Sequence, residues 1–291
     1  MISRREDNLL KAITCLEGGL TACGSTCGVI TGGSMGLALL HDKALQENTI
    51  EAEMGLLSLI EEYIKCFKKN INTTLCRERT GVDFHKITGQ MRYMIPGDKS
   101  LKCLSNISIA AKCLHTLQNK DFPKITTGQS KNKTTPIHCA QAVLKGVKAK
   151  TNIGDPMLER LSIVLDGGVG LSGGLCGAIA GSTIAIGIIH GSDIHNINIF
   201  QKIWATVKGH INLLLNTPIG FPEPFSISNE IGKKFRLETN DLLECKKITG
   251  KEFGDWETFQ NYITSSDKCR GLIDSTIGFT IEAIERSNKK I

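Results

Sequence analysis

Cysteine is the residue type through which this chain could carry out chemistry. The 291 residues include 11 cysteines, and the N-terminal segment MISRREDNLLKAI has charges without the continuous apolar run of a signal peptide. An odd number of cysteines without an export signal argues against a disulfide scaffold and favours metal ligands or redox-active thiols. The cysteines are residues 15, 23, 27, 66, 76, 103, 113, 139, 176, 245 and 269.

Three cysteines recur in two copies of one longer pattern. Residues 17–42 (EGGLTACGSTCGVITGGSMGLALLHD) match residues 166–191 (DGGVGLSGGLCGAIAGSTIAIGIIHG) at a constant offset of 149, without a gap. Self-similarity of this kind indicates an internal duplication. The paired cysteines are Cys27 with Cys176, Cys76 with Cys245 at an offset of 169, and Cys103 with Cys269 at an offset of 166.

The second half adds a fourth cysteine, Cys139, to its three paired ones. Thiolates bind zinc and iron–sulfur clusters, and four of them complete either site. We therefore predict a metal centre held by Cys139, Cys176, Cys245 and Cys269. The chain contains no C-x-x-C, so spacing alone does not select the metal. Two other interpretations stay open: a thiol/disulfide pair in which Cys176 reacts with Cys139 or another partner, and buried structural cysteines.

The first half keeps three members of this set, and three other cysteines are candidates for the missing ligand. Cys23 lies four residues before Cys27 on the same loop and is the first choice. The alternative is that this half has lost its site and kept its fold. Cys66 aligns with Phe235, so we expect it to act as a small buried hydrophobic residue. The retained cysteines are Cys27, Cys76 and Cys103, and the further candidates are Cys15 and Cys113.

Each duplicated stretch predicts a glycine-rich loop followed by a buried helix, because the apolar run lacks the alternation of a half-exposed strand. We expect Ser25 or Thr26 to cap the first helix. Cys27 would then lie in the first turn, where unpaired amides and the helix dipole favour a thiolate, and Cys176 should share that setting. The loop glycines are candidate cofactor contacts, with close helix packing as the alternative. They are Gly24, Gly28, Gly173 and Gly177.

An acid opens each duplicated stretch and a histidine closes its apolar run. We expect His41 and His190 to contact the terminal carbonyls of their helices as imidazolium ions, with a ligand or proton-relay role as the alternative. Glu17 and Asp166 could hydrogen-bond loop amides or tune a nearby centre. The loop GGVGLSGG lacks the lysine of a phosphate-binding loop, so nucleotide binding is not favoured.

The fold class expected is all-α, with two tandem helical-bundle domains related by the duplication. Residues 4–16 and 44–70 carry apolar stripes at helical spacing. Thr134 or Thr135 with Pro136 begins a further helix, which places Cys139 in its first turn.

The domain boundaries follow from composition and from the growing offset. Residues 1–117 form the first domain, the polar and lysine-bearing residues 118–135 form a linker, and residues 136–291 form the second domain. The offset between copies grows by 20, from 149 to 169. We place the extra length around residues 217–225, whose prolines cannot be interior helix.

Composition excludes several classes of function. Hydrophobic residues at 41% and charged residues at 22% are ordinary for a soluble globular protein. The net charge of +6 is spread in short lysine pairs and builds no nucleic-acid stripe. Each glycine-rich apolar run leaves about 15 helical residues, too few to insert across a membrane. We expect a cytoplasmic protein, and the sequence leaves open whether it forms a homo-oligomer.

The order and spacing of Cys139 in CAQAV, Cys176 in CGAIAG, Cys245 in CKKITG and Cys269 resemble the redox-active C-GCAxxG-C-C family. The resemblance covers residues 137 to 285 with all four cysteines and residues 9 to 117 with three. CGAIAG fits the signature fully, whereas the first copy, CGVITG, has Val29 where the family has alanine.

This resemblance implies small helical domains that are redox-active or hold a metal centre. A related domain in split-Soret cytochromes is associated with an iron–sulfur centre. The chain contains no C-x-x-C-H, so no c-type haem is expected. The function predicted is electron transfer or redox sensing through an iron–sulfur cluster, with zinc or no metal as alternatives, and with a redox partner protein that the sequence does not identify. The alternatives are a thiol/disulfide oxidoreductase that uses Cys176 and Cys139, and a non-catalytic helical interaction module.

Overall fold

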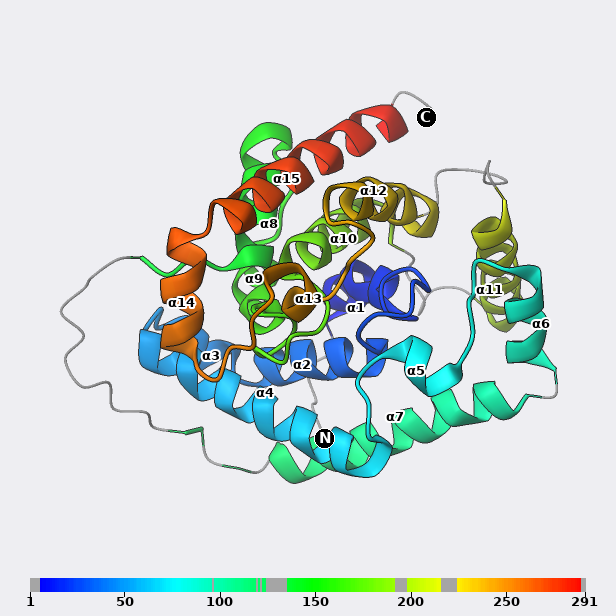
Figure 1. The fold of residues 1–291 in the computed structure, drawn as a ribbon, viewed down its shortest axis with the longest axis horizontal. Helices are drawn as coiled ribbons and strands as arrows, with labels where there is room; N and C mark the ends of the chain where they lie inside the picture. Colours follow the sequence, from blue (N-terminus) through cyan, green and yellow to red (C-terminus); the bar gives the residue numbers. More distant parts are fainter. Residues whose placement is uncertain are drawn as a thin grey trace.

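A computed structural model describes residues 6–95, 97–118, 120, 122–123, 135–191, 198–215 and 224–288 of the chain. These residues form α-helices and two short 3-10 turns without a β-strand, which confirms the all-α prediction (Figure 1). The first-half elements are α1 (Asp7–Ile13), η1 (Thr14–Leu16), α2 (Gly28–Leu40), α3 (Asp42–Leu45), α4 (Ile50–Ile71), α5 (Cys76–Thr80), α6 (Ile87–Met94) and α7 (Asp98–Leu117). The second-half elements are α8 (Cys139–Thr151), α9 (Pro156–Leu161), η2 (Ser162–Leu165), α10 (Gly177–His190), α11 (Ile199–Leu214), α12 (Pro224–Glu238), α13 (Cys245–Thr249), α14 (Trp256–Ser265) and α15 (Asp267–Asn288).

Helix α10 lies at the centre of the molecule. It packs against α8, α12 and α15 of its own half and against α1 of the other half (Figure 1). Its apolar run is buried nearly throughout, from Gly177 to Gly187. Most of the buried apolar residues of both halves form one continuous hydrophobic core that extends from Leu9 to Ile284, and Cys76, Val82 and Phe84 form a small separate cluster in the first half. The two copies therefore share a core, and neither half buries its apolar surface alone.

The pattern of helix contacts reproduces the duplication. In the first half α2, α4 and α7 pack against one another, and in the second half α10, α12 and α15 do the same. By this criterion α12 is the counterpart of α4. Helix α11 then has no counterpart, so the extra length of the second half includes a helix that precedes residues 217–225. Residues 217–223 of that segment and most of the expected linker at 118–135 lie outside the described residues.

The two glycine loops adopt the same unusual backbone. Residues 18–22 and residues 167–171 all have positive φ angles, between 42° and 85°, so each loop contains a left-handed turn of five residues. Val169 is among them at φ 65°, although β-branched residues strongly disfavour this region. Gly18, Gly19, Gly167 and Gly168 supply the start of each turn at no steric cost.

The two halves meet where these loops lie side by side. The hydroxyl Oγ1 of Thr26 accepts the backbone N–H of Leu175 at 2.8 Å, and these two residues occupy the same position in the two copies. An ion pair of 2.8 Å between Arg77 and the buried Glu244 crosses the same junction. Contact between equivalent residues is the pattern expected near a twofold axis.

Several expected helix starts were wrong by a few residues. Helix α4 begins at Ile50 with Thr49 as its cap, rather than at residue 44. Helix α8 begins at Cys139 itself, with His138 as its N-cap, and Thr135 and Pro136 precede it as non-helical residues. Cys27 and Cys176 are the N-caps of α2 and α10 and are not inside the first turn.

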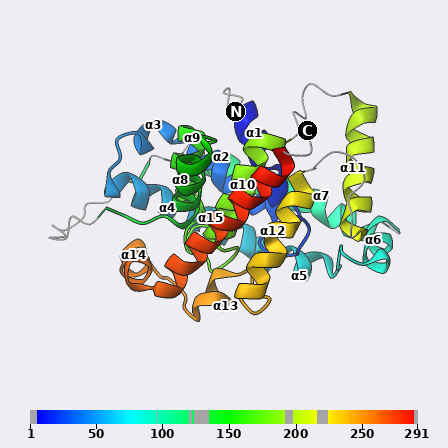
Figure 2. The ribbon, with the colours of Figure 1, turned by 90° about the horizontal axis from the view of Figure 1, so that it is seen from above.

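Helices α6 and α11 lie at one end of the molecule and α14 lies at the other, as the two perpendicular views agree (Figures 1 and 2). Most of the exposed large apolar side chains lie on α6, α7 and α11. Among the described residues, none of the helices combines the length and the apolar character that crossing a membrane requires.

The contact between α1 and α10 yields a stability prediction. A Cβ atom added at Gly187 would lie 2.1 Å from the carbonyl oxygen of Ala12, a backbone atom that cannot move aside cheaply. We expect Gly187→Ala to lower the free energy of unfolding, measured by urea denaturation, by about 1–3 kcal/mol. The control is Gly278→Ala within α15, where a Cβ meets no atom within 4 Å. That change should stabilise by up to about 1 kcal/mol, and an equal effect of both substitutions would contradict the close approach.

Candidate cysteine site

Backbone pairing between the second glycine loop and the start of α13 brings Cys176 and Cys245 together. The N–H of Cys176 donates to the carbonyl of Leu243 at 2.8 Å, and the N–H of Cys245 donates to the carbonyl of Gly174 at 2.6 Å. These two bonds enclose an isolated antiparallel bridge between Leu175 and Glu244. Each cysteine directly follows a bridge residue, so the bridge fixes the positions of both.

Two helices bring the other thiols to the same place. A Cβ atom at Gly177 would lie 2.8 Å from the Cβ of Cys139, so the missing side chain at Gly177 lets α8 place Cys139 next to the start of α10. Cys269 lies in the first turn of α15, where its N–H donates to Ser266 Oγ at 3.2 Å. A bond from Lys268 to the carbonyl of Ile248 ties that turn to α13.

The four cysteines of the second half line one small cavity. Its volume is about 20 Å³, room for about one water-sized atom. Cys139, Cys176 and Cys245 are between 7% and 9% exposed. The structure thus brings together all four residues that the sequence singled out. The rest of the lining is almost entirely apolar: Ala178, Ile248, Thr249, Phe253, Phe259, Tyr262, Leu272 and Ile273.

Burial raises the pKa of every thiol in this group. The pKa of Cys176 rises to about 12, because desolvation outweighs the hydrogen bonds that its sulfur receives from the amides of Ala178 and Ile179. Desolvation also raises the pKa of Cys139, Cys245 and Cys269, and the neighbouring thiols and Asp166 raise that of Cys139 further. The expectation that the helix start would favour a thiolate at Cys176 was therefore wrong, since burial is the larger effect.

The four thiols are suitable ligands for a soft metal. Their side chains are not, however, arranged as a ready coordination site. Buried thiols in an apolar pocket are the ligands that zinc and iron–sulfur clusters take. Within the part of the chain that the structure describes, however, no three His, Cys, Asp or Glu side chains already stand as a metal ion requires. The thiols would have to rotate within the cavity to bind one.

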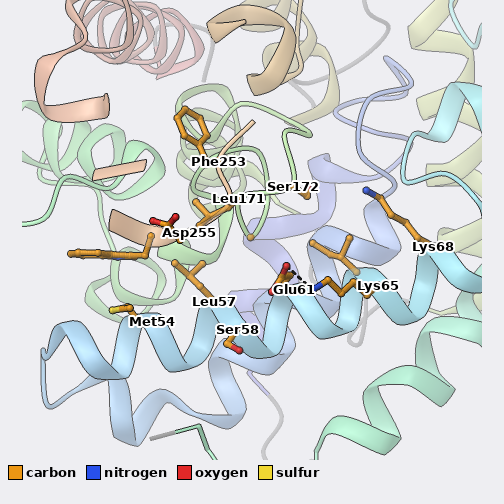
Figure 3. Close-up of a pocket in the computed structure, with 14 residues that line it drawn as sticks. Met54, Leu57, Ser58, Glu61, Lys65, Lys68, Leu171, Ser172, Phe253 and Asp255 are labelled. Atoms are coloured by element: carbon orange, nitrogen blue, oxygen red, sulfur yellow. Dashed lines mark ion pairs between the residues drawn. The ribbon is translucent and has the colours of Figure 1, made fainter. Parts of the chain in front are cut away.

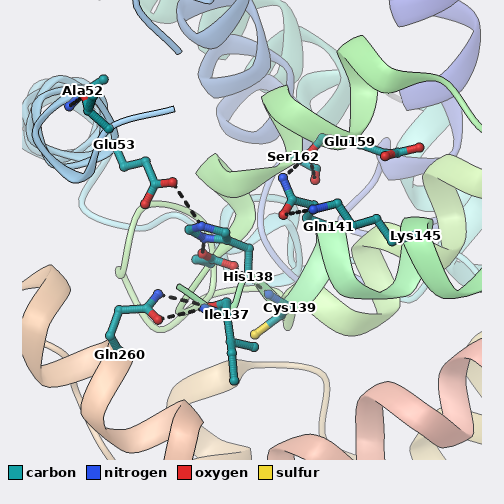
Figure 4. A network of polar contacts seen from close by, with 12 residues as sticks. Ala52, Glu53, Ile137, His138, Cys139, Gln141, Lys145, Glu159, Ser162 and Gln260 are labelled. Carbon is teal, nitrogen blue, oxygen red and sulfur yellow. Dashed lines mark hydrogen bonds and ion pairs between the residues drawn. The ribbon is translucent and has the colours of Figure 1, made fainter. Parts of the chain in front are cut away.

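A buried charged network contacts the start of α8 next to Cys139 (Figure 4). Asp166 accepts the N–H of Cys139 through Oδ1 at 2.9 Å, and its Oδ2 lies 2.6 Å from Nδ1 of His138. The other ring nitrogen of His138, Nε2, lies 3.2 Å from Oε1 of Glu53 on α4. This network links the two halves, and the carboxylate of Asp166 meets the positive end of the α8 dipole.

The network favours the imidazolium form of His138. Burial by itself would lower its pKa, but the negative charges and hydrogen bonds of Asp166 and Glu53 raise the pKa to about 10. The sequence analysis missed His138 and Glu53. The signal available for His138 was its place directly before a candidate ligand in IHC, whereas Glu53 is 85 residues away and carries no local signal.

A side-chain amide fixes the segment that leads into α8. Gln260 on α14 accepts the N–H of Ile137 at 2.9 Å and donates to the carbonyl of Ile137 at 3.0 Å, as Figure 4 shows. These two bonds mimic a strand pair and hold the approach to Cys139 against α14. The approach is therefore bound on one side by Gln260 and on the other by Asp166.

The loop glycines allow close packing of the elements that carry the cysteines. A Cβ at Gly24 would lie 2.7 Å from the Cβ of Arg77, and one at Gly173 would lie 2.7 Å from the Cβ of Lys246. At Gly28 a Cβ would lie 2.9 Å from the Cα of Glu17. The contacts at these positions and at Gly177 support the packing interpretation, and a cofactor contact there stays a prediction.

The first half repeats the backbone pairing with three thiols. Cys27 N–H donates to the carbonyl of Thr74, and Cys76 N–H donates to that of Ser25, both at 2.8 Å. Burial raises the pKa of Cys27, and it raises that of Cys76 to about 12, with a further rise from Cys27 and Cys103 nearby. These three cysteines are therefore neighbours. Tyr93 hydrogen-bonds Cys103.

The candidates for a fourth ligand in the first half have other partners. The sulfur of Cys23 lies 3.2 Å from Nη1 of Arg236 and 3.6 Å from Nε2 of His85. Cys15 is fully buried, and burial raises its pKa to about 12.

Cys66 and Cys113 form a disulfide that joins α4 to α7. The expectation of a small hydrophobic residue at Cys66 was therefore wrong, and Cys113 is not a free thiol for a ligand. The bridge joins residues 47 apart in sequence, so the prediction against disulfides also failed at this one position. The other described cysteines are free.

The two histidines at the ends of the apolar helices are not imidazolium caps. Burial lowers the pKa of both His41 and His190, which favours the neutral ring. His190 Nε2 pairs with Ser287 Oγ at 3.0 Å, and the His41 ring lies against Phe122 with centroids 5.0 Å apart. Both rings serve packing at the helix ends.

Comparison with known protein families shows to which family the chain belongs. The sequence model of a family described as putative redox-active protein (C_GCAxxG_C_C) matches residues 1–117 and 137–283. The chain belongs to this family. The match in two ranges confirms both the resemblance and the tandem duplication. Searches among curated proteins and among solved structures found no match.

The His138 network makes stability depend on pH. In the metal-free folded protein His138 keeps its proton until the pH approaches 10, whereas an unfolded histidine loses it near pH 6.5. The ion pairs therefore stabilise fully below pH 6.5, and this stabilisation is lost as the pH rises towards 10. Between these values the free energy of unfolding of the wild type should fall relative to that of His138→Gln, by up to about 1.4 kcal/mol per pH unit.

Urea denaturation of the metal-free protein across this pH range measures the difference. The control is His115→Gln, which alters an exposed histidine on α7 and should follow the wild type. A difference between the wild type and His138→Gln that does not change with pH would refute the charged state of His138.

Proposed function

We propose that the second half is a redox centre in which Cys139, Cys176, Cys245 and Cys269 hold an iron–sulfur cluster for electron transfer or redox sensing. The observation that supports this proposal is the convergence of these four thiols, from four separate elements, on one cavity. Membership in a family described as redox-active points the same way. Zinc has no redox chemistry, so iron is favoured over zinc.

Burial of the thiols favours a metal centre over thiol exchange. Thiol–disulfide exchange needs an accessible thiolate. In this site the pKa of Cys176 lies near 12, and the thiol is 9% exposed. A bound metal deprotonates the thiols that coordinate it, so metal binding would convert these buried cysteines to thiolates.

The residues present fit an iron–sulfur cluster in their ligand chemistry, but their side chains do not stand in the positions that a bound cluster requires. The four thiols supply the required ligand number, and the rest of the lining is almost entirely apolar. The cavity of about 20 Å³ holds one water-sized atom, so a cluster needs the side chains to move outward. When bound, the cluster would supply one-electron exchange at a potential set by its surroundings.

The chain's own residues position the ligands and control access. Asp166 holds the start of α8 through the N–H of Cys139, and His138 neutralises that carboxylate. Outer partners of this kind orient metal ligands and tune the centre. Phe259 and Ile273 are among the apolar residues that line the cavity.

Anaerobic reconstitution with ferrous iron and sulfide tests the proposal. The wild type should acquire iron, sulfide and a broad visible absorption that bleaches on reduction. Cys176→Ser should reduce bound iron to background, because one of the four ligands is lost. Cys15→Ser, a buried free cysteine outside the cavity, should retain the wild-type iron content. Wild-type iron content in Cys176→Ser would refute the site.

The first half provides a second control. Cys76 occupies the position equivalent to Cys245, in a group where three neighbouring thiols are present and Cys23 has other partners. We expect the second half alone to bind the cluster, so Cys76→Ser should leave the iron content unchanged. Loss of about half of the iron would show instead that both halves carry a centre.

The close approach of Cys139 to the start of α10 supports a second candidate function, a thiol/disulfide oxidoreductase. In that case Cys139 and Cys176 would form a reversible disulfide. Thiol titration of the metal-free protein with and without reductant separates the two. A disulfide between these two residues, found by peptide mapping in protein that takes up no iron, would support the second function.

A further inference from the structure

Large apolar side chains are exposed at one end of the molecule. Among the described residues, 12 of the 13 exposed large apolar side chains belong to α6, α7 and α11 or directly follow α6 or α11, and the other is Leu237 on α12. Helix α6 packs against α7, and α6 and α11 lie at the same end in both views (Figures 1 and 2). We call the exposed apolar side chains of residues 87–107 and 199–215 the end surface. Apolar surface gathered in this way marks an interaction site.

Helix α11 has its apolar face turned towards solvent. Phe200, Trp204, Val207 and Ile211 follow at steps of four, three and four, so they share one face of the helix, and all four are exposed. By contrast, the amide side chain of Asn212 is buried. A surface helix of a globular protein normally does the reverse and buries its apolar stripe. The apolar face of α11 is therefore open to an external partner.

Helix α6 and the start of α7 repeat this reversal. Gln90 of α6 is buried and donates to the carbonyl of Phe84 at 2.6 Å. Asn106 of α7 is also buried, and its Oδ1 accepts from Nε of Arg79 at 2.9 Å. In each helix an amide is thus turned inwards while apolar side chains face solvent. The exposed apolar side chains are Ile87, Met91 and Ile95 at α6, and Leu101, Leu104 and Ile107 on α7.

The chain around the end surface is positively charged. Residues 83–107 and 198–215 contain six lysine and arginine residues, two aspartates and no glutamate, a net charge of +4 out of +6 for the whole chain. The two aspartates, Asp83 and Asp98, pair with lysines of the same segment at 3.3 and 3.1 Å, so they are already occupied. Arg92 of α6 is exposed next to Met91. A partner that complements this surface is therefore both apolar and negatively charged.

Two other parts of the molecule show balanced charge. A cavity of about 290 Å³ between α4 and the second glycine loop is lined by two lysines and two acids, and Figure 3 shows Glu61 and Lys65 there as an ion pair, at 2.8 Å. Between α12 and α15, Lys234 pairs with Glu282 at 2.6 Å. The excess of positive charge is thus concentrated around the end surface.

A lipid surface fits these features better than a second copy of the chain. A twofold dimer through the end surface would bring two positive surfaces together, because both copies contribute the same patch. Helix α11 has 16 residues, a length of about 24 Å, which is too short to cross a bilayer. Basic amphipathic helices instead lie in the plane of the membrane, with Trp and Phe side chains at the boundary between headgroups and acyl chains.

We propose that the end surface binds the surface of a membrane that contains anionic lipids. The apolar face of α11 inserts at the headgroup boundary, together with the exposed side chains of α6 and the start of α7, and the cations of these segments contact lipid phosphates. The chain stays on one side of the bilayer, in keeping with the described helices, none of which is suited to crossing it. The four thiols take no part, so this proposal does not depend on the metal centre.

Flotation of the full chain with vesicles measures this binding. The vesicles are pure phosphatidylcholine or an equal mixture of phosphatidylcholine and phosphatidylglycerol, at low and at high salt. We expect the chain to float with the mixed vesicles at low salt. Its affinity should fall about tenfold or more without phosphatidylglycerol or at high salt, because the electrostatic attraction is then removed or screened.

Trp204 reports where the contact lies. Its side chain is 66% exposed, whereas the other tryptophan, Trp256, has a buried indole nitrogen. On addition of the mixed vesicles, tryptophan emission should shift to shorter wavelength and be quenched by brominated lipid. Trp204→Phe should still bind, because it keeps an aromatic side chain, but it should lose the shift.

Two matched pairs of variants test the apolar and the charged contributions. Phe200→Ser should weaken binding about tenfold or more, the effect of one buried aromatic side chain, whereas Leu237→Ser, 83% exposed on α12, should have no effect. Arg92→Gln should weaken binding about fivefold, whereas Lys145→Gln, an exposed lysine on α8, should have no effect. All four side chains are exposed, so thermal unfolding of the variants should match that of the wild type.

Three results would overturn the proposal. The first is equal binding to both kinds of vesicle. The second is failure to float with either kind, which would leave an acidic protein as the partner of this surface. The third is a concentration-dependent dimer in analytical ultracentrifugation that Phe200→Ser abolishes, because a second copy would then cover the end surface.

Discussion

The hydrogen-bonded bridge between each glycine loop and the short helix that follows later in the same half is the constraint on which the site depends. It joins Thr26 to Leu75, 49 positions apart, in the first half and Leu175 to Glu244, 69 positions apart, in the second, and the same pair of bonds occurs in both copies. The loop reaches this position only through a left-handed turn, which costs L-residues roughly 1–2 kcal/mol each. Glycines carry part of the turn, and the strain at Val169 persists because surrounding contacts fix it.

Burial governs the chemistry of this site more than helix geometry does. The N-cap positions of Cys27 and Cys176 offer amides to their sulfur atoms, yet the loss of solvent raises the thiol pKa values. A few residues away, His138 is equally buried but lies between two carboxylates, so its charge is retained. Desolvation therefore keeps the thiols neutral, whereas the neighbouring carboxylates keep His138 charged in the same core.

The sequence predicted those features that depend on local pattern or on repetition. The offsets of 149 and 169 paired the residues that form the two bridges, and the cysteines of the second half converge on one cavity as the repeated pattern suggested. The features it missed depend on contacts between distant segments. Nothing near Glu53 indicates a partner at His138, and nothing near Cys66 indicates a disulfide with Cys113. Helix starts were wrong by one or two residues at α2, where Cys27 is the cap, and by more at α8 and α4, where His138 and Thr49 are the caps, because local propensity resolves helix boundaries poorly.

Contact between Thr26 and Leu175 has a consequence for how the two copies can differ. In a symmetric pair of identical chains, any substitution at an axial position changes both sides of the contact at once, so the surface must remain complementary to itself. A fused duplication removes that requirement. Here a threonine hydroxyl on one side accepts the backbone N–H of a leucine on the other. Two identical subunits could not form this contact, because both would carry the same residue at that position. Freedom from self-complementarity allows one copy to specialise in supporting the other, as α4 does when it supplies Glu53 to the neighbouring half.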